Sequence, residues 1–323
     1  MTVSVSTPSR LHFGLLRFRQ ANGPSFGGLG MMIDSPRTIV ELDWADHWSH
    51  SGPDGPRAMA FAQHAFTSLS AERTEAKSAA LQVIVRQAIP AHRGLGGGTQ
   101  LALATGAGVR ALLGLPPCSA SELAAVVGRG ERSAVGSHGF IHGGLIWETG
   151  HQPGETLGRL KSHLAVSPEW RTVLVAPQDH VGLNGPDERQ AFDLLPPPPE
   201  TTATRLQSLA EEQILPAAQA GRIEAFGEGV FEYGRLSGEC FAAIQGGAYA
   251  TPAIADCVGA IRALGVRGVG QSSWGPTIFA IVEDEDRAHW LVDQLAARSA
   301  WANHHMQIVV ADNIGAVIEM QHA

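Results

Sequence analysis

Hydrophobic and polar residues alternate with a period of two through much of the first third of the chain, a pattern typical of β-strands. We expect strands at 3–6, 11–18, 31–33, 38–44 and 81–88. The turn-forming sequence Asp34-Ser35-Pro36 separates two of them. Helical spacing then predicts helices at 56–70, 98–113 and 119–127. Two short strands around 139–148 complete this half.

The second half begins with an apolar strand and continues mainly as helices. We expect strands at 170–177, 276–283, 306–311 and 314–319. We expect helices at 187–195, 201–219, 221–236, 252–264 and 286–299. Pro196–Pro199 cannot continue a helix and form a stiff spacer. The order of elements predicts an α+β protein with two domains, at 1–167 and 168–323.

Composition and charge exclude several classes of protein. The 323 residues are 44% hydrophobic and carry a formal net charge of −8, so no general basic field favours nucleic acid or an anionic membrane. No apolar run is long enough to cross a bilayer, and the N-terminus does not resemble a signal peptide. The three cysteines are widely spaced, which argues against a disulfide framework or a zinc knuckle. We therefore expect a cytoplasmic protein.

A glycine-rich segment at 90–104 joins the strand at 81–88 to the next helix. It reads Pro-Ala-His-Arg-Gly-Leu-Gly-Gly-Gly-Thr-Gln-Leu-Ala-Leu-Ala. Such a loop presents bare backbone N–H groups and a helix N-terminus to an anion, so it predicts a cradle for phosphate or diphosphate. A tight connection without a ligand is the plainer alternative. The loop lacks the Lys-Ser or Lys-Thr of a Walker motif and the acidic residue of a dinucleotide fingerprint.

Arginine and histidine residues gather in two further segments. Arg10 and His12 share one face of the expected first strand. Arg129, Arg132 and His138 lie in a glycine-rich stretch after the helix at 119–127. Arginine suits bidentate binding of phosphate or carboxylate, and histidine suits proton transfer. The plainer alternatives are a surface arginine, a packed histidine and a solvated turn.

Two polar loops in the second half are also candidates. Asn184, Glu188 and Arg189 could ligate Mg²⁺, hold a ribose or bind a carboxylate, and they could equally cap the helix at 187–195. The loop before the strand at 276–283 contains Gln271, Ser272, Ser273 and Trp274. Loops of this kind commonly bind ligands. Its tryptophan would either cover an aromatic substrate or serve as an ordinary packing residue.

Three of these segments resemble, in order and across nearly the whole chain, the signature motifs of the GHMP kinase superfamily. Residues 8–14, Pro-Ser-Arg-Leu-His-Phe-Gly, resemble the first motif. Residues 90–104 resemble the second and residues 268–280 the third. The resemblance implies an α+β fold, with a first half like domain 2 of ribosomal protein S5 and a ferredoxin-like second half.

Two catalytic features of the kinases are missing. Gly97-Gly98 stand where the kinases have Ser-Ser, which helps to hold the Mg²⁺ of ATP. Residues 133–142 contain no carboxylate, where many of the kinases carry an Asp as base. One branch of the superfamily, β-ribofuranosylaminobenzene 5′-phosphate synthase, departs in the same way. This chain resembles that branch in Arg-Leu-His-Phe-Gly, in residues 27–36, in Gly128-Arg-Gly and in Gly270-Gln-Ser-Ser-Trp-Gly-Pro.

The resemblance to this branch implies a particular reaction. The enzyme would condense 5-phosphoribosyl 1-diphosphate with 4-aminobenzoate or 4-hydroxybenzoate, releasing CO₂ and diphosphate, in tetrahydromethanopterin biosynthesis. It implies small-molecule substrates, Mg²⁺ as cofactor and a homodimer. The substituent of the benzoate and the metal ligands stay open. Two alternatives also stay open: an ATP-dependent small-molecule kinase of the superfamily, and a non-catalytic homologue that binds a ligand.

On this hypothesis the candidate site residues fall into three groups. The diphosphate loop consists of Gly94, Leu95, Gly96, Gly97, Gly98, Thr99 and Gln100. Candidate catalytic residues are Arg10, His12, Arg129, Arg132 and His138. Candidate substrate-binding residues are Asn184, Glu188, Arg189, Gln271, Ser272, Ser273 and Trp274.

Overall fold

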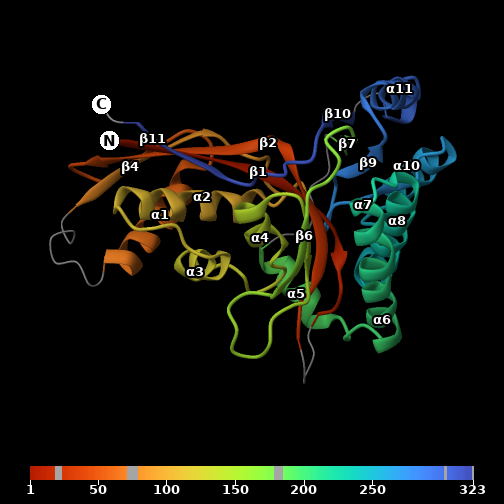
Figure 1. Ribbon diagram of the computed structural model, residues 1–323, viewed down its shortest axis with the longest axis horizontal. Helices are drawn as coiled ribbons and strands as arrows, with labels where there is room; N and C mark the ends of the chain where they lie inside the picture. The colour runs from red at the N-terminus through yellow and green to blue at the C-terminus, as the bar shows by residue number, and fades with distance from the viewer. Residues whose placement is uncertain (19–23, 71–78, 178–184, 302–303, 322–323) are drawn as a thin grey trace.

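Two β-sheets, each with helices packed on it, lie side by side in the computed structural model (Figure 1). The structure describes residues 1–18, 24–70, 79–177, 185–301 and 304–321. The first sheet has seven strands: β1 (Thr2–Leu15), β2 (Gly28–Ala45), β3 (Ser49–Ser51), β4 (Ala80–Gln87), β5 (Leu145–Glu148), β6 (Leu160–Leu164) and β11 (Val317–Gln321). The second has four: β7 (Arg171–Pro177), β8 (Gly268–Gln271), β9 (Ile278–Val282) and β10 (His304–Val309).

Two long antiparallel strands, β1 and β2, form the centre of the first sheet. The separate strands expected at 3–6 and 11–18 are one strand, and those at 31–33 and 38–44 are also one. The turn expected at Asp34-Ser35-Pro36 is wrong, because these residues continue β2. The pairing of β1 with β2 continues along both strands because its register shifts between Thr7 and Ser9 and between His12 and Gly14. Cross-strand pairing therefore overrode the local turn signal.

Helices cover one face of the first sheet, as Figure 1 shows for α1 and α2. They are α1 (Gly55–Ser70), α2 (Gly97–Leu112), α3 (Ala120–Val126) and α4 (Val135–His142). The short strands expected around 139–148 are wrong in part, since only β5 is a strand there. Gly139 explains the helix: a Cβ at this position would overlap the side chain of Met32, so close packing on β2 outweighs the weak helix propensity of glycine.

The second sheet is buried on both faces. Leu174 of β7 and Phe279 of β9 point toward the first half, whereas Val173 and Ile278 belong to the core under α10 and α11. The helices of this half are α5 (Gly185–Leu194), α6 (Glu200–Ser208), α7 (Leu215–Gln219), α8 (Ile223–Glu239), α9 (Ala242–Gln245), α10 (Pro252–Ala263) and α11 (Glu285–Ala296). A π-helical segment (Leu209–Ile214) links α6 to α7, and a 3-10 turn (Ser299–Trp301) follows α11.

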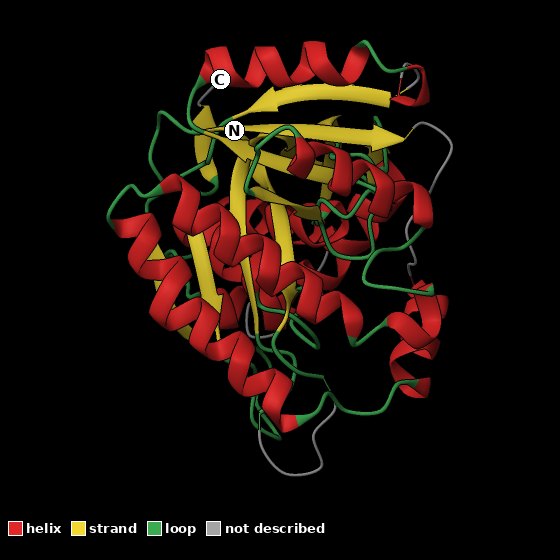
Figure 2. Ribbon diagram, turned by 90° about the vertical axis from the view of Figure 1, so that its right-hand side faces the viewer, coloured by secondary structure: helices red, strands yellow, loops and turns green. Residues whose placement is uncertain are grey.

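One core joins the two halves. It combines side chains of β1 and β9 with those of α6–α8, and the rings of Phe13 and Phe279 lie 5.1 Å apart within it. Figure 2 views the molecule from the side of these helices and shows them lying in front of the strands. The boundary expected at 167/168 falls between β6 and β7, and β11 then returns to pair with β1. No helix among the described residues is long and apolar enough to span a membrane.

A largely buried ion pair fixes the segment that returns to the first sheet. Asp312 is 8% exposed and accepts a hydrogen bond from Arg37 at 2.6 Å. Its other oxygen accepts from the backbone N–H groups of Ile314 at 3.0 Å and Gly315 at 2.7 Å. Removing this carboxylate would leave three buried or partly buried donors without their acceptor.

We therefore expect Asp312→Ala to lower the free energy of unfolding by about 2–4 kcal/mol, measured by urea denaturation. Arg86→Ala is the control, because Arg86 is 56% exposed in its ion pair with Glu41. That exposed pair should contribute little to stability, because water screens it. Equal destabilisation by the two substitutions would contradict this account of Asp312.

Candidate active site

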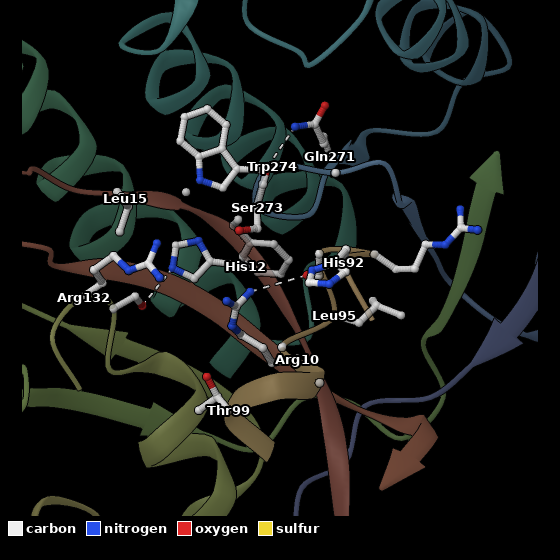
Figure 3. Close-up of a pocket in the computed structure, with 18 of the residues that line it drawn as sticks. Arg10, His12, Leu15, His92, Leu95, Thr99, Arg132, Gln271, Ser273 and Trp274 are labelled. Atoms are coloured by element: carbon white, nitrogen blue, oxygen red, sulfur yellow. Dashed lines mark hydrogen bonds between the residues drawn. The ribbon is translucent and has the colours of Figure 1, made fainter. Parts of the chain in front are cut away.

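A cavity of about 390 Å³ lies where β1, the glycine loop, α8 and the loop between β8 and β9 meet. Figure 3 shows the side chains that line it. His12 lies between Arg10 and Trp274, with Arg132 beside it. Segments from both halves of the chain contribute to the lining, so the cavity forms only when the two sheets pack together.

The glycine loop is clamped between two other segments. The Ser272 hydroxyl donates to the carbonyl of Gly94 at 2.7 Å and accepts from the backbone N–H of His12 at 3.0 Å. The backbone N–H of Arg10 donates to the carbonyl of Leu95 at 3.0 Å. Gly94 has a φ of 76°, and a Cβ there would overlap the Ser272 carbonyl. Glycine is required at this point both for the left-handed conformation and for the close approach.

The N-terminus of α2 opens into the cavity. Its N-cap, Gly96, has a φ of 77° and provides no side-chain cap. Gly97 and Gly98 line the cavity, and no hydrogen bond from their backbone N–H groups is found within the described part of the chain. Unsatisfied first-turn amides and the positive end of a sixteen-residue helix favour an anion at this position.

The cavity has a strongly positive lining. It contains five arginines, Arg10, Arg57, Arg93, Arg129 and Arg132. It also contains two histidines, and among the described lining residues there is no Asp or Glu. Burial lowers the pKa of Arg129, and the neighbouring charges of Arg57 and Arg132 lower it further. A cavity whose cations repel one another, and whose described lining contains no Asp or Glu, suits a highly charged anion.

Arg57 occupies the space in which a side chain at Gly98 would lie. A Cβ at Gly98 would overlap the guanidinium of Arg57, and a Cβ at Gly97 would come within 2.9 Å of the Ile89 carbonyl. The two positions that carry Ser-Ser in the kinases are therefore filled here by a cation and by backbone. This packing explains the Gly-Gly sequence physically.

His12 belongs to a buried hydrogen-bonded chain. Its Nε2 lies 2.9 Å from the Ser133 hydroxyl, which donates to Glu148 at 3.2 Å. Glu148 also accepts from the backbone N–H groups of Ala134 at 3.0 Å and Gly150 at 2.8 Å. Burial raises the pKa of Glu148 to about 8, although these hydrogen bonds oppose the shift. Burial, and then the charge of Arg10, lower the pKa of His12 well below its ordinary value.

Aromatic side chains form another wall of the cavity. Phe192, Phe241 and Trp274 all line it, and the Trp274 ring centroid lies 4.8 Å from that of Phe241 and 5.7 Å from that of Phe192. The three rings belong to one small cluster in which Trp274 is 9% exposed. The cavity thus offers a cationic, glycine-lined part for an anion and an aromatic part for a flat apolar group.

Most of the predicted site residues meet in this cavity. Those that line it are Arg10, His12, Gly94, Leu95, Gly96, Gly97, Gly98, Thr99, Arg129, Arg132, Gln271, Ser273 and Trp274. The strand pattern that placed Arg10 and His12 on one face predicted this correctly. Asn184 lies outside the described residues, and Glu188 and Arg189 belong to α5 but their side chains are not described.

Three predicted residues have side chains that serve other contacts instead of lining the cavity. Gln100 is fully buried, accepts from Thr7 at 2.6 Å and donates to the carbonyl of Gly136 at 3.0 Å. The His138 Nε2 lies 2.7 Å from the carbonyl of Gly158. The Ser272 hydroxyl bonds the Gly94 carbonyl and the backbone N–H of His12, as described above. Each of these polar side chains is buried and therefore needs a partner of its own.

Several residues of the site had no clear signal in the sequence. Arg57 and Phe192 lie in helices, and Phe241 lies in the turn between α8 and α9; none of these segments could be oriented toward the loop without the fold. Glu148 did leave a signal, because it ends the apolar run Leu-Ile-Trp of β5, where a charged residue is unusual. Its carboxyl approaches the same segment, 133–142, which itself lacks the Asp that many of the kinases carry there.

The described residues do not provide a protein-held magnesium site. No group of three or more His, Cys, Asp or Glu side chains that could hold a metal ion is found in the described ranges. The lining contributes guanidinium groups and hydroxyls, whereas Mg²⁺ is usually held by at least one carboxylate. The positive charge that the described lining offers an anion is that of the arginines and of the helix terminus.

Comparison with known proteins matches two segments of the chain to family models. Residues 60–144 match the GHMP kinases N terminal domain, and residues 214–300 match the GHMP kinases C terminal domain. The chain is 31% identical over 306 residues to beta-ribofuranosylphenol 5'-phosphate synthase of Methanothermobacter thermautotrophicus, covering 87% of this chain and 89% of that protein. It is 27% identical over 301 residues to the protein of the same name from Archaeoglobus fulgidus, covering 86% and 87%.

Solved structures share the fold at low sequence identity. Homoserine kinase from Cytophaga hutchinsonii superposes with a TM-score of 0.68 at 16% identity, covering 98% of this chain and 97% of that chain. Mevalonate pyrophosphate decarboxylase from Streptococcus pyogenes superposes with a TM-score of 0.69 at 10% identity, covering 97% of both chains. The predicted two-part α+β fold is confirmed.

We predict that Gly98→Ser weakens anion binding. The new Cβ must displace the Arg57 guanidinium, which removes one cation from the cavity while its flexible side chain lets the fold persist. The dissociation constant for inorganic diphosphate, measured by titration calorimetry, should rise about tenfold. Gly259→Ser is the matched control, because a Cβ there meets nothing within 4 Å. Unchanged affinity in Gly98→Ser would refute the role given to Arg57.

Glu148 should make stability depend on pH. Its pKa rises from an ordinary value of 4.5 to about 8 on folding, so burial is tolerated while the carboxyl is protonated. The contribution of Glu148 to the free energy of unfolding is complete below about pH 4.5 and is lost as the pH rises to 8. Compared with Glu148→Gln, the wild type should lose up to a few kcal/mol over this interval in urea denaturation. A constant difference across that range would contradict the assignment.

Proposed function

Because the chain belongs to the beta-ribofuranosylphenol 5'-phosphate synthase family of the GHMP kinase superfamily, we propose that it joins a phosphoribosyl group to a hydroxybenzoate ring. The substrates would be 5-phosphoribosyl 1-diphosphate and 4-hydroxybenzoate, and the products a C-riboside phosphate, CO₂ and diphosphate. The names of the relatives favour the phenol over the aniline, a choice that the sequence alone left open.

One observation supports this proposal most directly. A single cavity contains five arginines and the glycine loop on one part of its wall, and three aromatic rings on another. A phosphoribosyl diphosphate carries several negative charges, which suit the arginines and the amides of α2. The flat benzoate ring suits the space beside Trp274, and its carboxylate would find a guanidinium within the same cavity.

The chemistry that such a cavity favours is the departure of diphosphate. As the bond between ribosyl C1 and the diphosphate oxygen breaks, its electron pair goes to the diphosphate and the ribose gains positive charge. Arginines and amides that already point at the anion stabilise the charge that develops there. The ring carbon that carries the carboxylate then bonds to C1. Loss of CO₂ returns its electron pair to the ring and restores aromaticity.

Four further points stay predictions drawn from the family resemblance. They are a role in tetrahydromethanopterin biosynthesis, a requirement for Mg²⁺, a homodimer in solution and a cytoplasmic location. The described residues contain no protein-held magnesium site, so we assign no step to the ion. Light scattering of the purified protein measures the oligomeric state, and chelation followed by metal addition tests the requirement.

The reaction can be tested directly with purified protein. Phosphoribosyl diphosphate and carboxyl-labelled 4-hydroxybenzoate, supplied with Mg²⁺, should release labelled CO₂ and diphosphate in equal amounts. Parallel assays with 4-aminobenzoate compare the two acceptors. Transfer of phosphate from ATP to an alcohol, without CO₂ release, would instead support a kinase. Saturable binding of phosphoribosyl diphosphate without turnover would support a non-catalytic homologue.

We predict that Arg129→Ala lowers kcat/KM at least about thirtyfold, because a charge-assisted bidentate contact contributes roughly 2 kcal/mol or more. Arg129 is suited to this role, since its Nε is buried and finds no hydrogen-bond partner within the described part of the chain. Arg86→Ala, on the exposed edge of β4, is the control. An unchanged kcat/KM for both substrates would remove Arg129 from the site.

A further inference from the structure

The buried chain from His12 to Glu148 contains a directional pattern of hydrogen bonds. Ser133 has one hydroxyl proton, and its geometry directs that proton to the Glu148 carboxylate at 3.2 Å. The two lone pairs of the same oxygen then accept from the backbone N–H of Val135 at 3.3 Å and from the ring of His12 at 2.9 Å. A hydroxyl used in this way has no second proton to give. When Glu148 is ionised, above its pKa of about 8, the His12 Nε2 must therefore be the protonated nitrogen of the neutral ring.

The other ring nitrogen of His12 is consequently a free acceptor. Nδ1 makes no hydrogen bond within the described ranges, and His12 is one of the residues lining the cavity. Gly28 covers the opposite edge of the ring, since a Cβ there would lie 3.1 Å from Nε2 and 3.3 Å from Cε1. In Figure 3 the ring lies between Arg10 and Trp274, at the junction of the cationic and aromatic parts of the wall.

Glu148 is suited to share a proton with His12 rather than to hold a permanent charge. It is fully buried at the end of β5 and accepts three hydrogen bonds, which stabilise the carboxylate. Burial opposes them and brings its pKa to about 8. The other charged or titratable groups around this chain are Arg10 on β1, Arg132 before α4, and Tyr233 and Arg17 near Glu148. Among these neighbours no second carboxylate competes for the proton.

We propose that His12 Nδ1 accepts the proton of the para hydroxyl of the benzoate, and that Ser133 and Glu148 position His12 and take up its Nε2 proton. This inference rests on the proposed function. Transfer runs from the hydroxyl to Nδ1, from Nε2 to the Ser133 oxygen, and from the Ser133 hydroxyl to Glu148, with one proton moved at each step. The phenolate then donates its electron pair through the ring to form the bond to ribosyl C1. When CO₂ leaves, the proton returns along the same path to the product phenol.

The relay also determines which acceptor reacts faster. A phenol with a pKa near 10 can pass a proton to histidine, and the resulting phenolate activates the ring more strongly than an amine does. An aromatic amine has no proton acidic enough for this transfer. Without the base, however, a neutral amine is a better electron donor than a neutral hydroxyl. The relay therefore selects hydroxybenzoate through chemistry rather than through shape.

Ring-fluorinated substrates provide the test. The wild type, His12→Gln and Glu148→Gln are assayed with 4-hydroxybenzoate, with its 3-fluoro and 3,5-difluoro analogues, and with 4-aminobenzoate. For 4-hydroxybenzoate, His12→Gln should lower kcat roughly a hundredfold, with little change in KM for phosphoribosyl diphosphate. The wild-type to variant ratio of kcat should shrink as fluorine lowers the hydroxyl pKa and as the pH rises from about 8, where Glu148 becomes ionised, toward about 10. The variant should also come to prefer 4-aminobenzoate.

Glu148→Gln keeps an oxygen that accepts hydrogen bonds from Ser133 and the backbone, but it cannot take up a proton. Its kcat should therefore fall by a smaller factor than that of His12→Gln, with the same dependence on substrate pKa. His64→Gln on the exposed face of α1 is the control and should match the wild type. Equal losses with all four acceptors, or a ratio independent of pH, would overturn the relay. An inactive wild type would instead overturn the proposed function.

An NMR measurement that does not need turnover distinguishes a failure of the relay from a failure of the proposed function. In protein labelled with ¹⁵N-histidine, the His12 signal at about pH 9, where Glu148 is ionised, should be that of the neutral tautomer protonated at Nε2, assigned by its absence from His12→Gln. Ser133→Ala should shift or broaden that signal, because it removes the acceptor of the Nε2 proton. Protonation at Nδ1 in the wild type would contradict the inference whatever the assays show.

Discussion

The site depends on one close approach, the seating of the glycine loop against the loop between β8 and β9. Ser272 holds this contact by donating to the Gly94 carbonyl and accepting from the His12 backbone. The contact ties together three segments that are far apart in the sequence: the first strand, the phosphate loop and the loop ahead of β9. It requires a residue without a side chain at Gly94, because a Cβ there would overlap the Ser272 carbonyl. The cavity exists because these backbones can touch.

The positive charge of the cavity results from the arginine-bearing segments that this contact brings together. Arginines from β1, α1, the glycine loop and the segment before α4 all line one space. The acidic residues of the chain exceed its basic ones, yet the described lining contains no carboxylate. The charge separation is local, and it makes a polyanionic ligand the natural occupant of the cationic wall. Glu148 is set back behind Ser133, where it influences His12 without neutralising the arginines.

The fold is shared with small-molecule kinases, whereas the chemistry of the loop differs from theirs. A kinase of this superfamily must hold ATP with its Mg²⁺ and deprotonate an alcohol. Here Arg57 fills the space of a serine at Gly98, and a buried glutamate connects to a histidine in the first strand. On the proposed function, the same backbone cradle would support the departure of a diphosphate instead of the transfer of a phosphoryl group. Both reactions can use one scaffold, because the N-terminus of α2 favours an anion.

The sequence by itself determined the fold class, the position of the glycine loop and the clustering of Arg10 and His12. These features are local: glycines in series, strand parity and helix spacing leave a signal within a dozen residues. The order of three such segments also identified the superfamily. Helix boundaries such as 56–70 and 252–264 were predicted closely for the same reason.

Only the tertiary structure decided which side chains share the cavity. Gln100 and His138 were predicted as site residues, yet buried partners hold their side chains in other contacts. Arg57, Phe192 and Glu148 reach the site because sheet pairing and helix packing bring distant segments together, and no local pattern encodes such contacts. The same packing turned 135–142 into a helix and carried the strand through 34–36. Non-local contacts outweigh local propensities where burial and backbone pairing contribute more free energy.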